Sequence, residues 1–223
     1  LYNGQKSELL QSAKDYGSAG TLYIKTKRPK FAVGKNYNVV VGMKAGTFAL
    51  ANPSVLYEHR LTDNIHLSVN AEYIYSSGRY HFTIHKNTPD GTLAWDTTGI
   101  RQNGDIQAFR GEIGLFGYLP QGKWHLKGYY YWSNKGLPRA IIRNVWTSEQ
   151  RQWDQNAFVQ GSWENEWDLG ARAVGNGHRK LAVKVSAKYS NDYMRYLNPD
   201  TTLRYVDNHF TQQEVYFTAV VKY

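Results

Sequence analysis

The segment IHLSVNAEYIY (residues 65–75) alternates between apolar and polar side chains along its length. The odd-numbered positions, from Ile65 to Tyr75, are apolar or aromatic, and the even-numbered positions are polar apart from Ile74. Successive side chains of a β-strand point to opposite faces of a sheet. The segment therefore predicts a strand with one apolar and one polar face.

Further segments show the same period of two and bring the number of predicted strands to eight. They are NVVVGMKAG (38–46), SVLYEHRL (54–61), QAFRGEIGLFGY (107–118), WHLKGYYYWS (124–133), NAFVQGSW (156–163), LAVKVSAKYS (181–190) and EVYFTAVVKY (214–223). Helical spacing occurs in QKSELLQSAKDYGSAG (5–20), which predicts one short helix before the strands. We therefore expect an all-β chain of antiparallel strands.

The connections between these strands alternate in length. The segments 61–64 and 119–123 have the composition of tight turns, whereas 85–105, 134–152 and 197–209 are long. Short turns at one end of the strands and long loops at the other are typical of outer-membrane β-barrels. The segment 165–180 breaks this rule, because it falls at a short-turn position and is not short.

The composition agrees with a membrane barrel without requiring one. Aromatic residues make up 15% of the 223 residues, and tyrosine and tryptophan concentrate at the two boundaries of such barrels. No apolar run approaches the roughly 20 residues of a transmembrane helix, and no basic-then-apolar leader is expected at Leu1. The net charge of +9 comes from 27 Lys and Arg spread along the chain, so we expect no nucleic-acid partner.

The stretch YGSAGTLYIKTKRP (16–29) resembles the end of the plug domain in TonB-dependent outer-membrane receptors. In that family a tyrosine and a glycine, followed by small residues, precede a strand that ends in Thr-Lys. The matching residues here are Tyr16, Gly17, Gly20, Thr26 and Lys27. The family more often has Gly-Val-Ile-Asn-Ile where this chain has GTLYIKTK. Segments 129–139 and 156–163 are also similar to the barrel of Bacteroidetes-type members.

This resemblance implies two parts. Residues 1–30 would be the C-terminal end of a plug domain, and residues 31–223 would be the first strands of a transmembrane β-barrel of about 22 strands. Residues 27–36 would be the crossing between them. The chain would hold only part of the receptor.

The same resemblance implies a function and partners. The protein would be an outer-membrane receptor of a Gram-negative bacterium, importing a scarce large nutrient such as a siderophore or cobalamin. Its partners would be outer-membrane lipid and, through an N-terminal region missing from these residues, the TonB energy-coupling complex. Whether a surface lipoprotein also binds is left open.

Two groups of residues are candidates for function. The long connections carry aromatic and arginine side chains, which together bind ligands with rings and anionic groups. They are Trp95, Asp96, Arg101, Arg139, Arg143, Trp146, Arg151 and Trp153. An alternative for the tryptophans at 146 and 153 is a place at the membrane boundary. Polar strand positions are expected to face the lumen: Arg110, Glu112, Lys127, Lys184 and Lys188.

No arrangement in the sequence indicates catalysis or a cofactor. The chain has no cysteine, and histidine pairs such as His59 and His66 lack an obvious third ligand, so we expect no metal site. No Gly-X-Ser-X-Gly or phosphate-binding loop occurs. The glycines at 111, 114 and 117 are expected to mark kinks or close contact with something in the lumen.

Two other interpretations remain open. Eight strands can close on themselves as a small outer-membrane barrel with an adhesin or structural role, although this leaves residues 1–36 unexplained. The apolar faces could instead pack against a second sheet, as in a soluble β-sandwich that binds a ligand.

Overall fold

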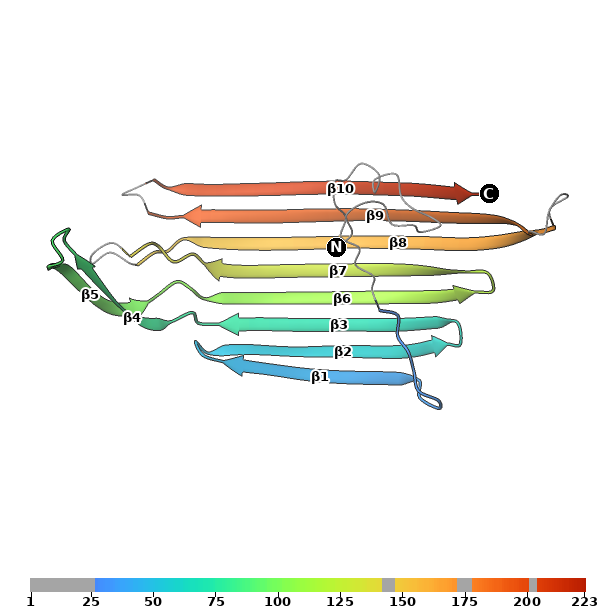
Figure 1. The fold of residues 1–223 in the computed structure, drawn as a ribbon, viewed down its shortest axis with the longest axis horizontal. Coiled ribbons are helices and arrows are strands. Elements are labelled where there is room, and N and C mark those ends of the chain that lie inside the picture. Colours follow the sequence, from blue (N-terminus) through green and yellow to red (C-terminus); the bar gives the residue numbers. More distant parts are fainter. Residues whose placement is uncertain (1–26, 142–146, 172–177, 201–203) are drawn as a thin grey trace.

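Ten β-strands make up most of the chain that the computed structural model describes, namely residues 27–141, 147–171, 178–200 and 204–223 (Figure 1). The strands are β1 (Tyr37–Gly46), β2 (Leu50–Thr62), β3 (Ile65–Ser76), β4 (Tyr80–Asn87), β5 (Leu93–Arg101), β6 (Ile106–Leu119), β7 (Gly122–Gly136), β8 (Arg151–Ala171), β9 (His178–Asn198) and β10 (Val206–Lys222). The prediction of an all-β chain is confirmed. The predicted helix at 5–20 lies outside the described residues.

Eight strands form one antiparallel sheet in the order β1-β2-β3-β6-β7-β8-β9-β10. Each strand pairs with its neighbour in the chain, except that β3 pairs with β6 and leaves β4 and β5 as a separate two-stranded hairpin. These eight strands coincide with the eight predicted from alternation. Figure 1 shows them side by side, with the hairpin projecting beyond one end of the sheet.

The hairpin corrects the prediction of a long loop at 85–105. Its closing turn is built by Thr88, whose amide donates to the Thr92 carbonyl at 2.8 Å, and by Asp90, which accepts from the Thr92 amide at 3.2 Å. Pro89 and Gly91 suit such a turn, so the Thr-Pro-Asp-Gly run marks the tip of a hairpin rather than an open loop. β4 does alternate, with Tyr80, Phe82 and Ile84 on one face, but it is only eight residues long. β5 alternates weakly, so the pattern does not reveal a pair of strands.

The connection lengths also differ from the prediction at two places. β8 and β9 are each 21 residues long and extend past their neighbours, so most of the segment 165–180 is strand. Conversely, the connection between β1 and β2 is short although it lies at the long-loop end. Phe48 and Ala49 take φ values of 61° and 55° there, the left-handed backbone that tight hairpin turns require.

The register places apolar side chains on one face across all eight strands. Residues that are paired in register share a face, and one such row can be followed from β1 to β10. It consists of Val39, Tyr57, Val69, Ile113, Gly128, Val159, Tyr189 and Val215. We call the face that carries this row the apolar face.

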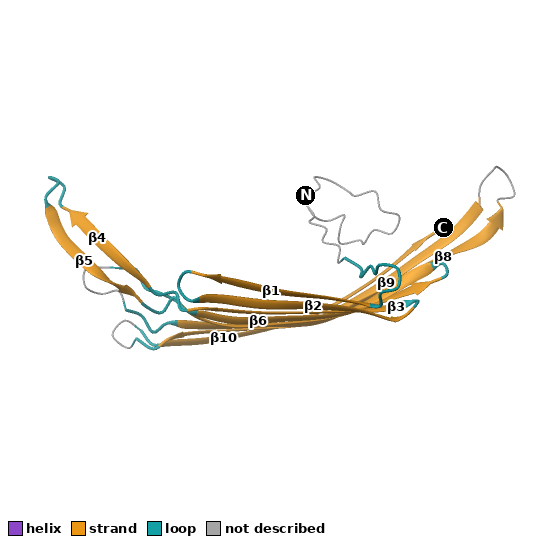
Figure 2. Cartoon of the chain, turned by 90° about the horizontal axis from the view of Figure 1, so that it is seen from below, coloured by secondary structure: helices purple, strands orange, loops and turns teal. Residues whose placement is uncertain are grey.

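The adjacent row belongs to the opposite face and is mainly polar. It consists of Asn38, Glu58, Ser68, Gly114, Lys127, Gln160, Lys188 and Tyr216. We call this the polar face. The sheet bends toward the side on which residues 27–36 cross it (Figure 2), and their contacts described below are with the polar face.

The sheet is open, and no described segment covers its apolar face. β1 pairs only with β2, and β10 pairs only with β9, so the eight strands do not close on one another. Apolar side chains remain exposed, with Val41 at 76%, Val159 at 54% and Val215 at 80%. Neither the closed eight-stranded barrel nor a two-sheet sandwich is formed by the described residues.

The strand glycines of β6 are covered by aromatic rings of nearby residues. Gly117 lies on the apolar face under the indole of Trp124, its partner in register. Gly114 lies on the polar face under the ring of Phe116, and Gly111 on the apolar face beside Phe109. Rings that fill the space above strand glycines stabilise a sheet. Two of the three glycines therefore lie on the apolar face and one on the polar face, and each lies against a ring of the chain itself.

Replacing Gly117 with alanine is expected to destabilise the fold by about 1–3 kcal/mol, since the new Cβ collides with the Trp124 indole. Gly161→Ala is the matched control on the same face, because its Cβ would meet its nearest atom at 3.5 Å. Samples heated to increasing temperatures and run on a gel give the temperature at which the band of the folded protein disappears. This temperature should fall for G117A and stay near the wild-type value for G161A. Equal midpoints for the two variants would contradict the packing assigned to Trp124.

Candidate functional site

Ion pairs between neighbouring strands run across the polar face. Arg110 of β6 pairs with Glu72 of β3, and Lys127 of β7 pairs with Glu112 of β6 at 2.8 Å. Others are Lys123–Glu164, Lys135–Asp154 at 2.9 Å, Lys180–Glu166 at 2.6 Å and Lys188–Glu214 at 3.9 Å. Opposite charges on paired strands stabilise a sheet in this way. The polar face is therefore largely matched in charge.

The five residues predicted to face a lumen all lie on this polar face. Arg110, Glu112 and Lys127 belong to the ion pairs of β3, β6 and β7, and Lys188 approaches Glu214. Lys184 stands opposite Glu164 in the register of β8 and β9. The alternation in the sequence thus assigned these side chains to one common face.

Residues 28–31 are held against the polar face near its tight-turn end. The guanidinium of Arg28 lies 5.0 Å from the ring centre of Tyr118 and 5.6 Å from that of Phe116, and it donates to the Gly117 carbonyl at 3.4 Å. Pro29 is fully buried. We call residues 28–31 and the side chains that they contact the anchor.

Aromatic and cationic contacts complete the anchor on β2 and β3. The ring of Phe31 meets the His66 ring edge-on at 5.1 Å between centroids, and the Arg60 guanidinium lies 5.2 Å from the Phe31 centroid. The carbonyl of Lys30 accepts from the Asn38 amide at 3.1 Å. Such contacts fix where the chain enters β1, and they place the crossing predicted for 27–36 on the polar side of the sheet.

A groove of about 970 Å³ lies between this crossing and the sheet. Lys27, Lys30 and Lys35 line it from the crossing, and Glu58 and Glu112 line it from the polar face. The two walls carry opposite charges, and Val40 and Leu56 add apolar surface to the lining. Lys27, the one described residue of the plug-like signature, is exposed at its edge.

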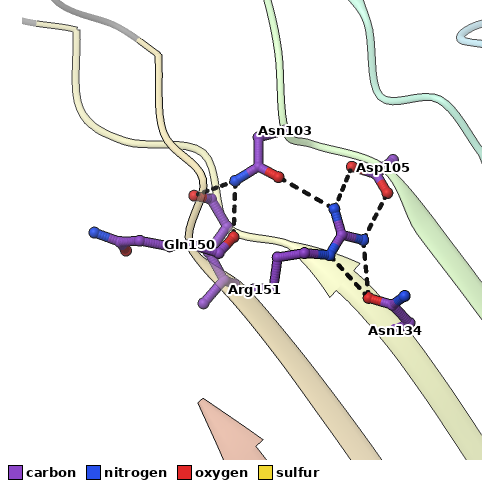
Figure 3. A network of polar contacts seen from close by, with 6 residues as sticks. Asn103, Asp105, Asn134, Gln150 and Arg151 are labelled. Carbon is purple, nitrogen blue, oxygen red and sulfur yellow. Dashed lines mark hydrogen bonds and ion pairs between the residues drawn. The ribbon is translucent and has the colours of Figure 1, made fainter. Parts of the chain in front are cut away.

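A polar network holds the connections together at the opposite end of the sheet (Figure 3). The Arg151 guanidinium donates to both carboxylate oxygens of Asp105, at 2.8 and 3.3 Å, and to Asn134 at 2.8 and 3.0 Å. Asn103 accepts from Arg151 at 3.4 Å and donates to the carbonyls of Gln150 at 2.7 Å and Leu137 at 3.2 Å. The network therefore joins the β5–β6 connection to both ends of the β7–β8 connection.

The ion pair within this network perturbs Asp105. Hydrogen bonds from Arg151 hold the pKa of the Asp105 carboxyl below its ordinary value of 3.8, against the opposing effect of partial burial. The ionised form of Asp105 is thereby favoured in the folded state.

The structure brings three of the predicted ligand-binding arginines to this loop end. Arg101, at the end of β5, donates to the Arg139 carbonyl, and the Arg139 guanidinium lies 3.5 Å from Asp200. Arg151 is bound to Asp105. Two of the three guanidinium groups are therefore paired with carboxylates of the chain itself.

The predicted tryptophans and Asp96 lie apart from these arginines. Trp95 stands opposite Lys86 on one face of the hairpin, and Asp96 is on the other face, 3.4 Å from His85. Trp153 is on the apolar face of β8, with the Arg195 guanidinium 5.0 Å from its ring. This position fits the alternative interpretation of Trp153, an aromatic residue at the edge of the apolar band. Arg143 and Trp146 lie outside the described residues, as do Tyr16, Gly17, Gly20 and Thr26.

Sequence reasoning missed two groups of residues. The first is the anchor, whose partners come from β2, β3 and β6, with no sequence pattern that links them. The second is formed by Asn103, Asp105 and Asn134. Asn103 has φ of 56° and precedes Gly104, and an Asn-Gly pair is a recognisable turn signal that could have indicated its place.

Neither a spanning helix nor a metal-binding cluster occurs in the described ranges. They contain no helix long and apolar enough to cross a membrane. They also bring together no group of three or more histidine and acidic side chains that could hold a metal ion.

Comparison with protein-family models and with curated proteins finds no relative of this chain. Function must therefore be argued from the faces of the sheet, the anchor and the loop end.

Removing the charge of Asp105 is expected to loosen the β7–β8 connection. Since the folded-state pKa is depressed, the contribution of this ion pair is complete above the unfolded pKa of about 4. It is lost as the pH falls through the folded value, while Arg151 stays charged. Asp105→Asn should therefore speed tryptic cleavage after Arg139 at neutral pH. In the wild type, acid should speed the cleavage of the same connection by pepsin. Asp90→Asn, in the exposed hairpin turn, is the control; equal cleavage rates in D105N and wild type would refute the role of the network.

Truncating Arg28 is expected to release the anchor. Arg28→Ala removes the contacts with Tyr118 and Phe116 and the hydrogen bond to Gly117, so amide exchange of residues 27–32 should rise about tenfold. Lys30→Ala is the control, because only the backbone carbonyl of Lys30 bonds to Asn38. An unchanged exchange rate in R28A would mean that the contacts of Arg28 do not hold the segment.

Proposed function

We propose that this chain is the end of the plug and the first part of the wall of a TonB-dependent outer-membrane receptor. In this proposal the apolar face contacts lipid and the polar face looks into an occupied, wet lumen. The protein imports a scarce large nutrient and catalyses no reaction. The observation that carries the proposal is the pair of adjacent register rows, one apolar and one polar, that run unbroken through all eight strands.

The exposure of the apolar face supports a hydrocarbon environment. A soluble protein rarely leaves a contiguous apolar surface larger than a few hundred Å² in water. Here the apolar row is uncovered from Val39 on β1 to Val215 on β10, at 54% and 80% exposure. Lipid chains cover such a surface on the outside of a membrane barrel. Aromatic residues at the band's ends, including Trp153 and Trp124, match the boundaries of such a band.

The anchor supports an occupied interior. The chain enters β1 by crossing the polar face, to which Arg28 and Phe31 are bound. A plug domain that lies inside a barrel must be joined to the wall from the lumen. The lysines of the crossing and the glutamates of the opposite wall give the groove between them complementary charge.

The open edges support a larger barrel. β1 and β10 each leave one row of backbone donors and acceptors without a strand partner in the described chain. In hydrocarbon each unsatisfied group costs several kcal/mol, so an open sheet cannot remain in a membrane. In the proposed receptor, further strands pair with both edges and close a barrel of about 22 strands.

The loop end supports a binding role. The long connections and the β4–β5 hairpin gather at the end opposite the tight turns (Figure 1). In the proposed orientation that end is extracellular, and the plug precedes the anchor in the chain, at the periplasmic end. Ligand binding at the loops and plug would favour a plug conformation on which the inner-membrane energy complex acts.

The lipid exposure of the apolar face is tested by a pair of neighbouring substitutions. Val159→Arg puts a charge in the middle of the apolar band and should cost about 2–4 kcal/mol on insertion. Gln160→Arg, one residue along β8, adds the same charge to the polar face and should be tolerated. Insertion of the full-length protein into lipid vesicles, scored by the gel mobility of unheated samples, measures both.

Two results would overturn the proposal. One is equal insertion of V159R and Q160R. The other is full-length protein that is released from cells without detergent, because a barrel in the outer membrane needs detergent for extraction.

A further inference from the structure

Arg101 differs from the other arginines at the loop end because its guanidinium is buried without a carboxylate. The residue is 8% exposed. Its Nε and Nη1 atoms are buried and have no hydrogen-bond partner, and its Nη2 donates to the carbonyl of Arg139. No described acidic side chain pairs with it. Arg139 and Arg151, in contrast, have Asp200 and Asp105.

The backbone around Arg101 is built to hold it at the base of the hairpin. Arg101 pairs with Tyr80 at the last register position of β4 and β5. Directly below, Gly78, with φ of 58°, packs against Gly104 so closely that a Cβ at Gly78 would collide with the Gly104 backbone. Asn103 ties the same segment to the β7–β8 connection. Arg101 is therefore held where the base of the hairpin meets the β7–β8 connection, whose Arg139 carbonyl it contacts.

A buried guanidinium with free donors is stabilised most strongly by an anion. Desolvation of a charge is compensated only by an opposite charge with good geometry, and a guanidinium binds carboxylate and phosphate groups through two parallel hydrogen bonds. The loop end supplies three guanidinium groups and two carboxylates in these contacts, so one negative group is missing.

We propose that Arg101 binds an anionic oxygen group, a carboxylate or a phosphate, carried by the ligand. In this role Arg139 and Arg151 position the connections and do not contact the ligand through their paired donors. Because Nε and Nη1 lie below the surface, the anion enters as the segments 102–105 and 137–141 separate locally. This inference deepens the proposed function, since it assigns an acidic chemical class to the ligand of the receptor.

The test uses full-length protein in detergent, with sodium phosphate and sodium citrate as separate probes in titration calorimetry at constant ionic strength. Arg101→Gln should raise the Kd of the bound probe at least tenfold, the usual effect of losing a charged hydrogen-bond donor. Arg79→Gln is the matched control, because it removes the same charge from an exposed position at the base of the hairpin. It should change the Kd by less than about twofold. Binding of phosphate alone or citrate alone identifies the anionic group.

Amide exchange gives a readout that a structural role alone would not move. The bound anion should slow exchange in 102–105 and 137–141 of the wild type and of R79Q, and leave exchange in R101Q unchanged. Arg101→Lys, which keeps the charge without the planar group, serves if R101Q does not fold, and should bind about tenfold more weakly.

The proposal is overturned if neither probe binds the wild type at up to roughly 10 mM, if the Arg101 variants bind like wild type, or if R79Q weakens binding as much as R101Q. Those results leave the lipid exposure of the apolar face untouched. Conversely, equal insertion of V159R and Q160R would remove the receptor proposal while an anion site at Arg101 could stand.

Discussion

The unbroken antiparallel register from β1 to β10 is the constraint on which the other features depend. A shift of one residue in any pairing would move that strand's apolar side chains to the opposite face. Because the pairings between adjacent strands keep the two rows in phase, the row through Val159 is apolar and the row through Gln160 is mainly polar. The ion pairs add to this constraint, since Glu72–Arg110 and Glu112–Lys127 link β3, β6 and β7 in the same register.

The two ends of the sheet have different physical characters. At the tight-turn end, rings and guanidinium groups hold the chain through stacking, and Arg28 is the residue that contacts most of the partners. At the loop end, charged and amide side chains hold connections through hydrogen bonds, with Arg151 at the centre. The first arrangement suits a permanent attachment beside an enclosed space. The second leaves one guanidinium, that of Arg101, without a charged partner, which suits recognition.

Alternation made the strands and their faces predictable. The eight segments found from the period of two are the eight strands of the sheet, and the five polar residues assigned to a lumen share one face. The hairpin was missed because β4 is short and β5 alternates weakly, and because the Thr-Pro-Asp-Gly turn looked like part of a loop. The length of β8 and β9 was missed because polar strand ends resemble turns in sequence. Arg101, Arg139 and Arg151 were all named from the sequence as candidates, but residue type alone could not separate the buried, unpaired Arg101 from the other two.

The sequence by itself determined that this is an all-β chain whose strands have one apolar and one polar side, since side-chain alternation is a local property of extended backbone. It also indicated the tight turns at 61–64 and 119–123. Only the tertiary structure decided that the polar side receives residues 28–31, because His66, Tyr118 and Arg60 meet there from strands distant in sequence. The same holds for the charge balance at the loop end, since hydrogen bonds between connections follow from their positions in space and leave no periodic trace in the sequence.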